Sequence, residues 1–259
     1  MSGEGATYAQ PTPRRLYVHD DLTDEVARRE GAGSPAATLA RDLLSLLARD
    51  AERVRILTLG EQVERVVAQG GHAPFALALG IGAAGQRVAE ALHARAGWFP
   101  RVRRIGLTRE EDGRGGYRVV STEAGDLPAQ LDGATDCASL AVVDDTVFSG
   151  LTMRTLISAL PEAARRRTHA FCLRGVAESI AAVAALCPIT AGIAAPGRRL
   201  DDVSFINASG LVRRVAIRRS GRPPLAFFKR PDWIRAWFPA VHGEVLAVCE
   251  RLNALLEPA

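Results

Sequence analysis

Two adjacent acids, Asp144 and Asp145, directly follow an apolar run from Leu140 to Val143. Such a run is typical of a buried central strand in a parallel sheet, and ligands of these sheets bind beyond the carboxyl ends of the strands. Carboxylates at that position can accept hydrogen bonds from the hydroxyl groups of a sugar. The pattern therefore predicts a hydroxyl-bearing ligand at the end of this strand.

The segment after the acids, Thr146 to Thr152, has the composition of a phosphate site. It leads into a helical pattern over Met153 to Leu160, and backbone N–H groups at the start of a helix can hold a phosphate. Gly150 lets the backbone approach a ligand closely, and Ser149 adds a hydroxyl donor. The alternative is an ordinary helix start, capped by Ser149, after an acid pair with no special role.

Four apolar residues, two acids, three variable residues and then Ser-Gly-x-Thr make up this block, which resembles the phosphoribosyl pyrophosphate (PRPP) signature of the type I phosphoribosyltransferases. The resemblance implies that Asp144 and Asp145 are catalytic, orient the ribose hydroxyls and bind Mg²⁺. It also implies that the 5-phosphate of PRPP is held by Thr146, Val147, Phe148, Ser149, Gly150, Leu151 and Thr152.

A second glycine pattern, G-x-G-x-x-G over residues 80–85, follows one apolar segment and precedes a helical one. This is the fingerprint of a dinucleotide-binding turn, which also requires an acid at the end of the next strand. Glu110 and Glu111 lie a little too far along the chain for that role. The family resemblance instead implies a pyrophosphate loop, formed by Gly82, Ala83, Ala84 and Gly85.

The expected pyrophosphate loop departs from the family pattern at Ala83, where many relatives carry Lys or Arg. Arg87 either supplies the missing charge or is an exposed helix residue. The polar segment 109–117 matches the mobile hairpin that closes over PRPP in relatives, and Arg109, Arg114 or Arg118 would then reach the pyrophosphate. An ordinary surface hairpin is the alternative.

The alternation of strand-like and helix-like segments predicts a doubly wound, mostly parallel α/β sheet. We expect a disordered tail over residues 1–14, an α/β PRPP-binding core over 15–197, and a hood with C-terminal helices packed on the core over 198–259. Strands are expected at about 16–18, 54–59, 75–79, 103–107, 117–121, 140–143, 169–173 and 189–193, and helices at 36–47, 61–69, 87–96, 152–160, 178–186 and 244–256.

The hood covers the acceptor in this family, and residues 198–238 are the natural candidate, with 16–21 contributing. Phe205 and Asn207 are the expected acceptor residues, whereas the aromatics of 227–237 are expected to pack the last helices onto the sheet. Phe148 replaces an Asp that handles a purine proton in the hypoxanthine–guanine relatives, which argues against 6-oxopurine salvage. Phe148 either faces the acceptor or packs under the loop.

Composition excludes several classes. The 259 residues are 47% hydrophobic and carry a net charge of +4, but the cations are scattered arginines with Lys229 as the single lysine, so we expect no nucleic-acid partner. The longest apolar stretch, 180–196, is broken at Pro188, so no membrane span is expected. Four cysteines without metal spacing indicate reduced thiols in a cytoplasmic protein.

The resemblance as a whole implies a Mg²⁺-dependent phosphoribosyltransferase that transfers 5-phosphoribosyl from PRPP to a nucleobase-like nitrogen and releases pyrophosphate. It also implies a homodimer. Two alternatives remain: phosphoribosylation of a non-nucleobase specialised metabolite, and a non-catalytic PRPP-sensing regulator. Replacing both Asp144 and Asp145 by Asn is expected to lower turnover more than about tenfold without unfolding the chain.

Overall fold

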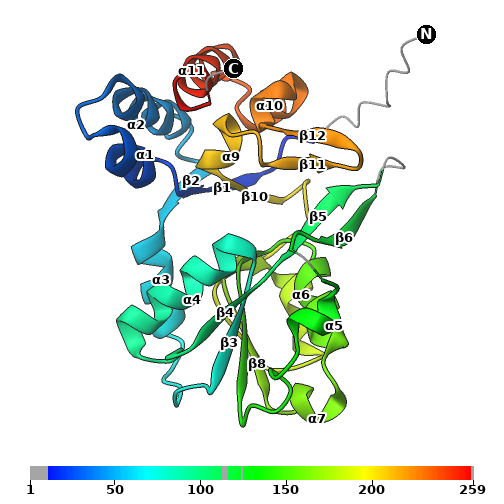
Figure 1. Ribbon diagram of the computed structural model, residues 1–259. Coiled ribbons are helices and arrows are strands. Elements are labelled where there is room, and N and C mark those ends of the chain that lie inside the picture. Colours follow the sequence, from blue (N-terminus) through cyan, green and yellow to red (C-terminus); the bar gives the residue numbers. More distant parts are fainter. Residues whose placement is uncertain (1–10, 113–115, 124, 258–259) are drawn as a thin grey trace. The chain divides into compact units, whose positions relative to one another are not determined.

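The computed structural model describes residues 11–112, 116–123 and 125–257, and the chain forms two compact units (Figure 1). Unit 1 comprises Met1–Thr58, Glu111–Tyr117 and Leu200–Ala259, and unit 2 comprises Leu59–Glu110 and Arg118–Arg199. Most of the tail expected over residues 1–14 falls on residues 1–10, outside the described part. Of the remainder, Arg14 donates its backbone N–H to the carbonyl of Asp201 at 3.1 Å.

Unit 2 is built on a five-stranded sheet in the order β4-β3-β7-β8-β9, and every neighbouring pair is parallel. The prediction of a doubly wound, mostly parallel α/β fold is therefore confirmed. The strands are β3 (Leu77–Ile81), β4 (Val102–Ile105), β7 (Leu140–Val147), β8 (Thr168–Val176) and β9 (Ile189–Ala195).

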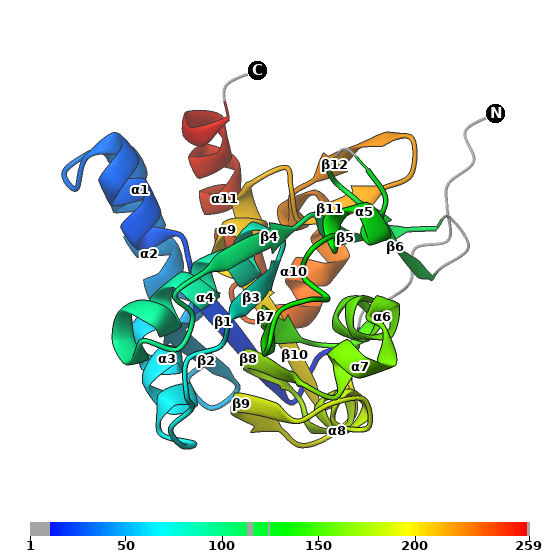
Figure 2. The same ribbon diagram turned by 60° about the horizontal axis from the view of Figure 1, so that its bottom comes forward.

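Helices cover both faces of this sheet, because successive side chains of its strands point to opposite sides. In β7, Leu140 and Val142 pack toward α6, whereas Ala141 and Val143 pack toward α3 and α4. Figures 1 and 2 show α3 and α4 on one side of the sheet and α6 and α8 on the other. The helices are α3 (Leu59–Val67), α4 (Gly82–Ala96), α5 (Leu127–Gln130), α6 (Leu151–Ala159), α7 (Glu162–Arg165) and α8 (Ala177–Ala184).

The strand order places a topological switch point between β3 and β7. Counted along the chain, the five strands follow the order 2-1-3-4-5, and the chain leaves β3 into α4 on one face and β7 into α6 on the other. The two connections diverge at the carboxyl ends of these strands, which is the position where doubly wound sheets bind ligands. The 80–85 segment and the acid pair both lie at this position.

Unit 1 has its own three-stranded parallel sheet, in the order β10-β1-β2. Leu16 and Val18 of the central strand join a core formed with Leu43 of α2 and Leu252 of α11. The strands and helices are β1 (Arg15–Asp20), β2 (Val54–Thr58), β10 (Val203–Asn207), α1 (Thr23–Glu30), α2 (Pro35–Leu47), α9 (Ala208–Val212), α10 (Pro231–Trp237) and α11 (His242–Leu256), with a short antiparallel hairpin, β11 (Ile217–Arg219) and β12 (Arg222–Leu225).

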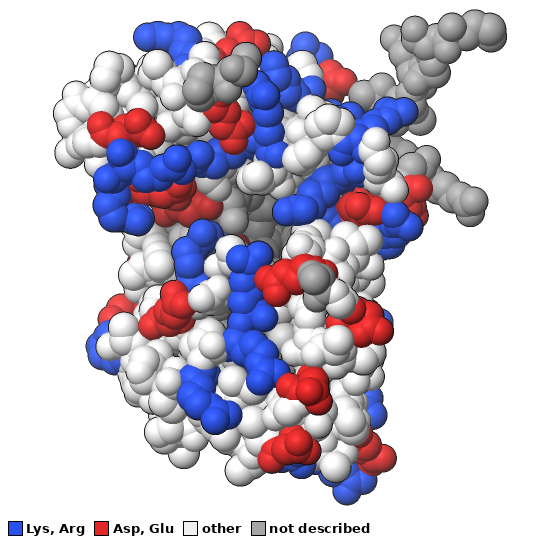
Figure 3. Space-filling model, in the orientation of Figure 1, with Lys and Arg blue, Asp and Glu red and all other residues white. Residues whose placement is uncertain are grey.

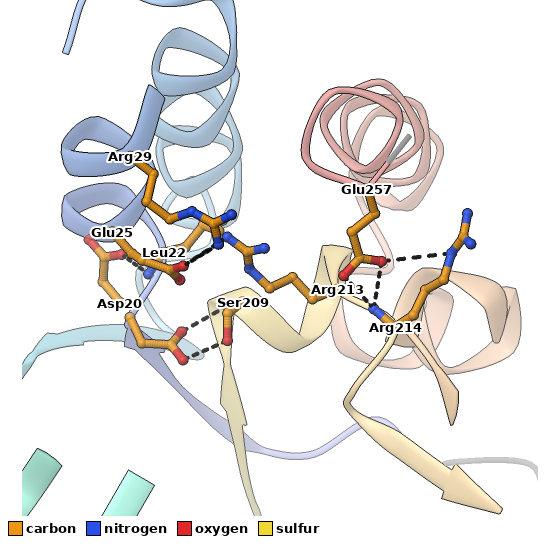
Figure 4. Close-up of polar contacts among 9 residues, drawn as sticks. Asp20, Leu22, Glu25, Arg29, Ser209, Arg213, Arg214 and Glu257 are labelled. Atoms are coloured by element: carbon orange, nitrogen blue, oxygen red, sulfur yellow. Dashed lines mark hydrogen bonds and ion pairs between the residues drawn. The ribbon is translucent and has the colours of Figure 1, made fainter. Parts of the chain in front are cut away.

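Polar contacts join the N-terminal and C-terminal segments of unit 1 (Figure 4). Glu25 pairs with Arg213 at 3.0 Å, and Asp21 accepts hydrogen bonds from the backbone N–H and hydroxyl of Ser209. Asp20 instead accepts from the N–H groups of Leu22 and Thr23, at 3.1 and 3.0 Å, in the turn that leads into α1. These carboxylates therefore have structural partners within unit 1.

The two compact units divide the chain differently from the expected core over residues 15–197. Residues 15–58 group with residues 200–257, because β1 pairs in parallel with β10 from the C-terminal segment as well as with β2. The core sheet of unit 2 thus begins with β3 rather than with the N-terminal strand. The short hairpin strands β5 (Leu107–Glu111) and β6 (Tyr117–Ser121) lie where the polar segment was expected.

The four cysteines are free, and burial raises the pKa of the Cys187 thiol to about 11 and that of Cys249 to about 12. Such thiols are unreactive at neutral pH. Within the described residues, no helix combines the length and apolar character that a membrane crossing requires. On the face drawn in Figure 3, arginines and acids are interspersed, in line with their scatter along the sequence.

Two histidines take part in an aromatic cluster in unit 2. The rings of His72 and His169 lie 4.7 Å apart, and His169 Nε2 is 2.9 Å from the hydroxyl of Thr190. Burial, together with the neighbouring His72, lowers the pKa of His169 to about 4. Because this value lies below the ordinary 6.5, the folded state loses stability as the pH falls from about 6.5 toward 4.

We predict that His169→Phe makes the free energy of unfolding less dependent on pH. The half-exposed position reduces the effect, so the loss between pH 7 and pH 4.5 should shrink by about 1–2 kcal/mol. Urea unfolding at the two pH values measures it, with His93→Gln on the exposed face of α4 as the control. Equal pH dependence in the His169 variant and the wild type would contradict the assignment.

Candidate functional site

β7 extends beyond the end of its pairing with β3, and the acid pair lies in this extension. The register pairs Gly80 of β3 with Val143, the residue before the acids, while β7 continues beside β8 to Val147. Asp144 and Asp145 therefore lie at the switch point, past the paired part of β3. The strand is four residues longer than the sequence predicted, because its last residues pair with β8 alone on that side.

The ionised form of the Asp144 carboxylate is disfavoured in this site. It is half-buried, and its Oδ1 accepts a hydrogen bond from the N–H of Asp145 at 2.8 Å. Burial raises its pKa well above the ordinary range, and the adjacent charge of Asp145 raises it further, whereas the guanidinium of Arg109 acts in the opposite direction.

Asp145 has a buried cationic partner on the neighbouring strand. The Nη2 atom of Arg174 lies 3.3 Å from Asp145 Oδ2, and its Nη1 donates to Oε1 of Gln62 on α3 at 2.8 Å. The side chain of Arg174 is 0% exposed and that of Asp145 is 16% exposed. Replacing Asp145 by Asn would leave this guanidinium charge buried without its carboxylate partner, so we expect that replacement to lower the stability of the fold.

The segment Thr146–Thr152 comprises the last two residues of β7, the turn over residues 148–150 and the first two residues of α6. Gly150 has a φ of +68°, in the left-handed region, and a Cβ atom there would lie 3.3 Å from the carbonyl of Ser179. Ser149 Oγ accepts from the N–H of Leu151 at 3.3 Å within the turn, whereas the N-cap position of α6 is occupied by Gly150, so α6 has no side-chain cap. The N–H groups of Thr152 and Met153 lie in the first turn, where an α-helix has no carbonyl partner for them.

The glycine segment is a helix start rather than a loop. We expected the helix from Arg87, but α4 begins at Gly82, so Gly82, Ala83, Ala84 and Gly85 form its first turn. A Cβ atom on Gly85 would lie 2.4 Å from the carbonyl oxygen of Val143. The glycine therefore serves close packing of α4 against β7. Arg87 is exposed and has no hydrogen bond or ion pair within the described residues.

Arg109 is the hairpin arginine that reaches the site. Its Nη1 atom lies 3.4 Å from Ser149 Oγ, and its charge acts on Asp144. Arg118 instead pairs with Glu110 on the neighbouring strand of the hairpin. Arg114 lies outside the described residues. The phosphate-loop candidate, the acid pair and one hairpin arginine are thus brought together within unit 2.

The expected acceptor residues lie in the other unit. Phe205 and Asn207 belong to β10 of unit 1, where Phe205 stacks on Tyr17 of β1 with ring centroids 5.0 Å apart. The nearby aromatics pack the C-terminal helices, since Trp237 and Phe228 are buried in the core of unit 1. Phe148 is half-buried, and its carbonyl accepts from the hydroxyl of Ser179 at 2.7 Å.

Sequence reasoning missed Gln62 and Arg174. The apolar run of β8 was expected to end at Leu173, whereas the strand continues to Val176 with Arg174 inside it. A single arginine within an otherwise apolar run was the available signal, because a cation is rarely buried unless it is paired.

The site offers few carboxylate ligands, which suits a cation that keeps most of its bound water molecules. The described residues contain no group of three or more His, Cys, Asp or Glu side chains that could hold a metal ion. Mg²⁺ commonly uses only one or two protein carboxylates, with water and substrate oxygens completing its shell. Asp144 fits that requirement, whereas Asp145 already faces Arg174.

An open hollow of about 680 Å³ lies at the opposite end of the unit 2 sheet. Its lining comes from residues next to the amino ends of β3, β4 and β7: Ala76, Pro100, Arg101, Gly133, Asp136 and Cys137. Parallel sheets bind ligands at the other edge, so this hollow is separate from the acid pair.

No protein-family model matches the sequence, and no curated protein matches it. Solved structures do resemble it. One is a purine phosphoribosyltransferase from Pyrococcus horikoshii, with 16% identity and a TM-score of 0.34, which covers 57% of this chain and 84% of the other. Another is the xanthine-guanine-hypoxanthine phosphoribosyltransferase of Helicobacter pylori, with 16% identity, a TM-score of 0.35 and coverage of 57% and 86%.

A third similar structure is an APRTase from Giardia lamblia complexed with 9-deazaadenine, with 12% identity and a TM-score of 0.36, covering 60% of this chain and 84% of the other. What this chain does must follow from its own residues, since these identities are low.

We predict that Gly85→Ala lowers the free energy of unfolding by about 2 kcal/mol, because the added methyl group would overlap the Val143 carbonyl. Gly60→Ala in α3 is the matched control: its Cβ meets nothing within 4 Å, so it should be neutral or slightly stabilising. Urea unfolding measures both. Equal stabilities of the two variants would mean that α4 does not approach β7 this closely.

Proposed function

We propose that this chain binds PRPP at the switch point of unit 2 and transfers its phosphoribosyl group to an acceptor, with release of pyrophosphate. The observation that carries the proposal is the meeting, within one unit, of three features. These are the acid pair at the end of β7, the turn into α6, and Arg109 beside Ser149. The PRPP signature requires the first two in this order.

The 5-phosphate would bind over the segment Thr146–Thr152. The free N–H groups at the start of α6 and the positive end of its dipole favour an anion there. Gly150 keeps the backbone open, and the hydroxyl of Ser149 faces the guanidinium of Arg109, which adds a positive charge. Binding of the 5-phosphate here would anchor the sugar, with its reactive carbon directed toward the acid pair.

Asp144 and Asp145 would accept hydrogen bonds from the two ribose hydroxyls. Asp144 would also hold Mg²⁺, which neutralises charge on the pyrophosphate. The raised pKa of Asp144 means that a positively charged ligand beside it would offset the cost of its ionised form. The first turn of α4 would face the pyrophosphate through its N–H groups.

The protein would act chiefly by positioning and charge stabilisation. Displacement at the anomeric carbon passes through a ribosyl cation with departing pyrophosphate, which preorganised charges stabilise without covalent participation. Phe148 cannot transfer a proton, so the acceptor would be something other than a 6-oxopurine that needs one. Phe205 and Asn207 stay proposed as acceptor residues on the family resemblance alone; within unit 1, the ring of Phe205 stacks on Tyr17.

One observation favours a second candidate, a PRPP-sensing regulator without catalysis. The first turn of α4 contains no basic residue, and Arg87 in its second turn is exposed. Pyrophosphate would then have fewer cationic partners than a catalytic site needs to stabilise its departure. A regulator would bind PRPP and release no pyrophosphate.

Pyrophosphate release from Mg·PRPP, measured against a panel of nucleobases, amines and hydroxylated acceptors, tests the proposal. Release with one acceptor class supports transfer and identifies the class. Calorimetric binding of Mg·PRPP without release from any acceptor favours the regulator. Absence of binding by the folded protein would overturn both.

We predict that Asp144→Asn lowers pyrophosphate release more than tenfold, a loss of about 1.4 kcal/mol of transition-state stabilisation. Its thermal midpoint should be equal or higher, because the pKa of Asp144 is raised in the folded state and its charge at pH 7 therefore opposes folding.

Asp136→Asn, at an exposed acid in the hollow at the other end of the sheet, is the control and should leave release unchanged. Full activity of the Asp144 variant would contradict the assignment of the acid pair. A parallel loss of stability in that variant would contradict the charge argument.

A further inference from the structure

Arg174 is the one buried cation among the lysines and arginines that the structure describes. Its side chain is also the largest that is fully buried in this part of the chain. A guanidinium removed from water is costly unless it is paired and hydrogen-bonded, so its position has to be explained by its partners.

The partners of Arg174 lead directly to the acid pair. Arg174 is opposite Thr146 in the β7–β8 register, one residue beyond Asp145. From there its Nη2 reaches Asp145 Oδ2 at 3.3 Å, while Nη1 donates to Oε1 of the fully buried Gln62 at 2.8 Å. Two fixed points on different elements, α3 and β7, thus hold one planar guanidinium.

Asp144 has no comparable arrangement. Its Oδ1 accepts the N–H of Asp145, and the cation that acts on it is the exposed Arg109 of the hairpin strand β5. The two acids therefore differ in mobility and in charge compensation. Asp145 is held by a buried pair, and Asp144 is the member left to meet a cation or a hydroxyl.

The geometry points to Arg174 as a positioning residue that holds the carboxylate of Asp145 in a fixed orientation for the ribose hydroxyls of PRPP, with Gln62 fixing Arg174 in turn. This role rests on the proposed function, because it assigns a purpose to an ion pair at the proposed ribose site. Arg174 itself is buried and acts through Asp145.

A double-mutant cycle on stability tests the ion pair independently of any ligand. Arg174→Met and Asp145→Asn should each lower the thermal midpoint by roughly 10 °C, because each leaves one buried charge without its partner. The double variant removes both charges and should regain at least half of either loss. Additive losses would overturn the pairing.

Calorimetric affinity for Mg·PRPP separates positioning from a merely structural role. Arg174→Met should weaken binding at least tenfold, Arg174→Lys should recover part of that loss, and the double variant should stay weak although its stability recovers. Affinity that returns together with stability, or wild-type affinity in Arg174→Met, would overturn the positioning role.

Arg95→Met is the matched control, since Arg95 forms an exposed pair with Glu64 in the same unit. It should shift the thermal midpoint by no more than about 3 °C and leave affinity unchanged. If the wild type binds no Mg·PRPP, the proposed function fails and the ribose role fails with it. The stability cycle then still decides whether Arg174 and Asp145 are coupled.

Discussion

The electrostatics of the site depend on two carboxylates, carried by consecutive residues at the half-buried end of a strand. At a separation of about 4 Å and an effective dielectric constant of about 20, like charges repel by about 4 kcal/mol, which is comparable to the whole stability of many domains. The chain places one guanidinium, that of Arg174, in contact with Asp145 and a second, that of Arg109, close enough to act on Asp144. Only the first is buried. The arrangement therefore compensates one charge firmly and leaves the other partly uncompensated.

The sheet makes this arrangement possible because the pairing of β3 with β7 ends just before the acid pair. The chain leaves them toward opposite faces, so the turn after β7 lies at this junction. The same point demands close packing between α4 and β7, which is why Gly85 lies against the carbonyl of Val143. The strand topology, the close packing at Gly85 and the acid pair thus meet at one junction of the sheet.

Sequence patterns predicted the features that are formed by residues close together in the chain. The acid pair, the turn and the central strand are contiguous in sequence, so one motif specifies them together. The start of α4 was predicted at Arg87 and lies at Gly82, because small residues such as those of 82–85 fit a loop as well as the first turn of a helix packed on a strand. Arg174 was missed because its partners, Gln62 and Asp145, are 112 and 29 residues away. The pairing of Arg15 with Val203 likewise joins distant segments, which no periodicity reveals.

Because the negative charges of Asp144 and Asp145 are compensated unequally, the binding of an anionic group and the binding of a cation at this site would be coupled. An anionic phosphate at the turn after β7 would draw on Arg109, the cation that lowers the pKa of Asp144. With that cation engaged, ionised Asp144 would gain more from a divalent cation beside it. By linkage, the cation would in turn strengthen phosphate binding, since coupling between two sites is reciprocal. A site of this kind should therefore take an anion and a cation together more readily than either alone, as a metal complex of a phosphorylated sugar would supply them.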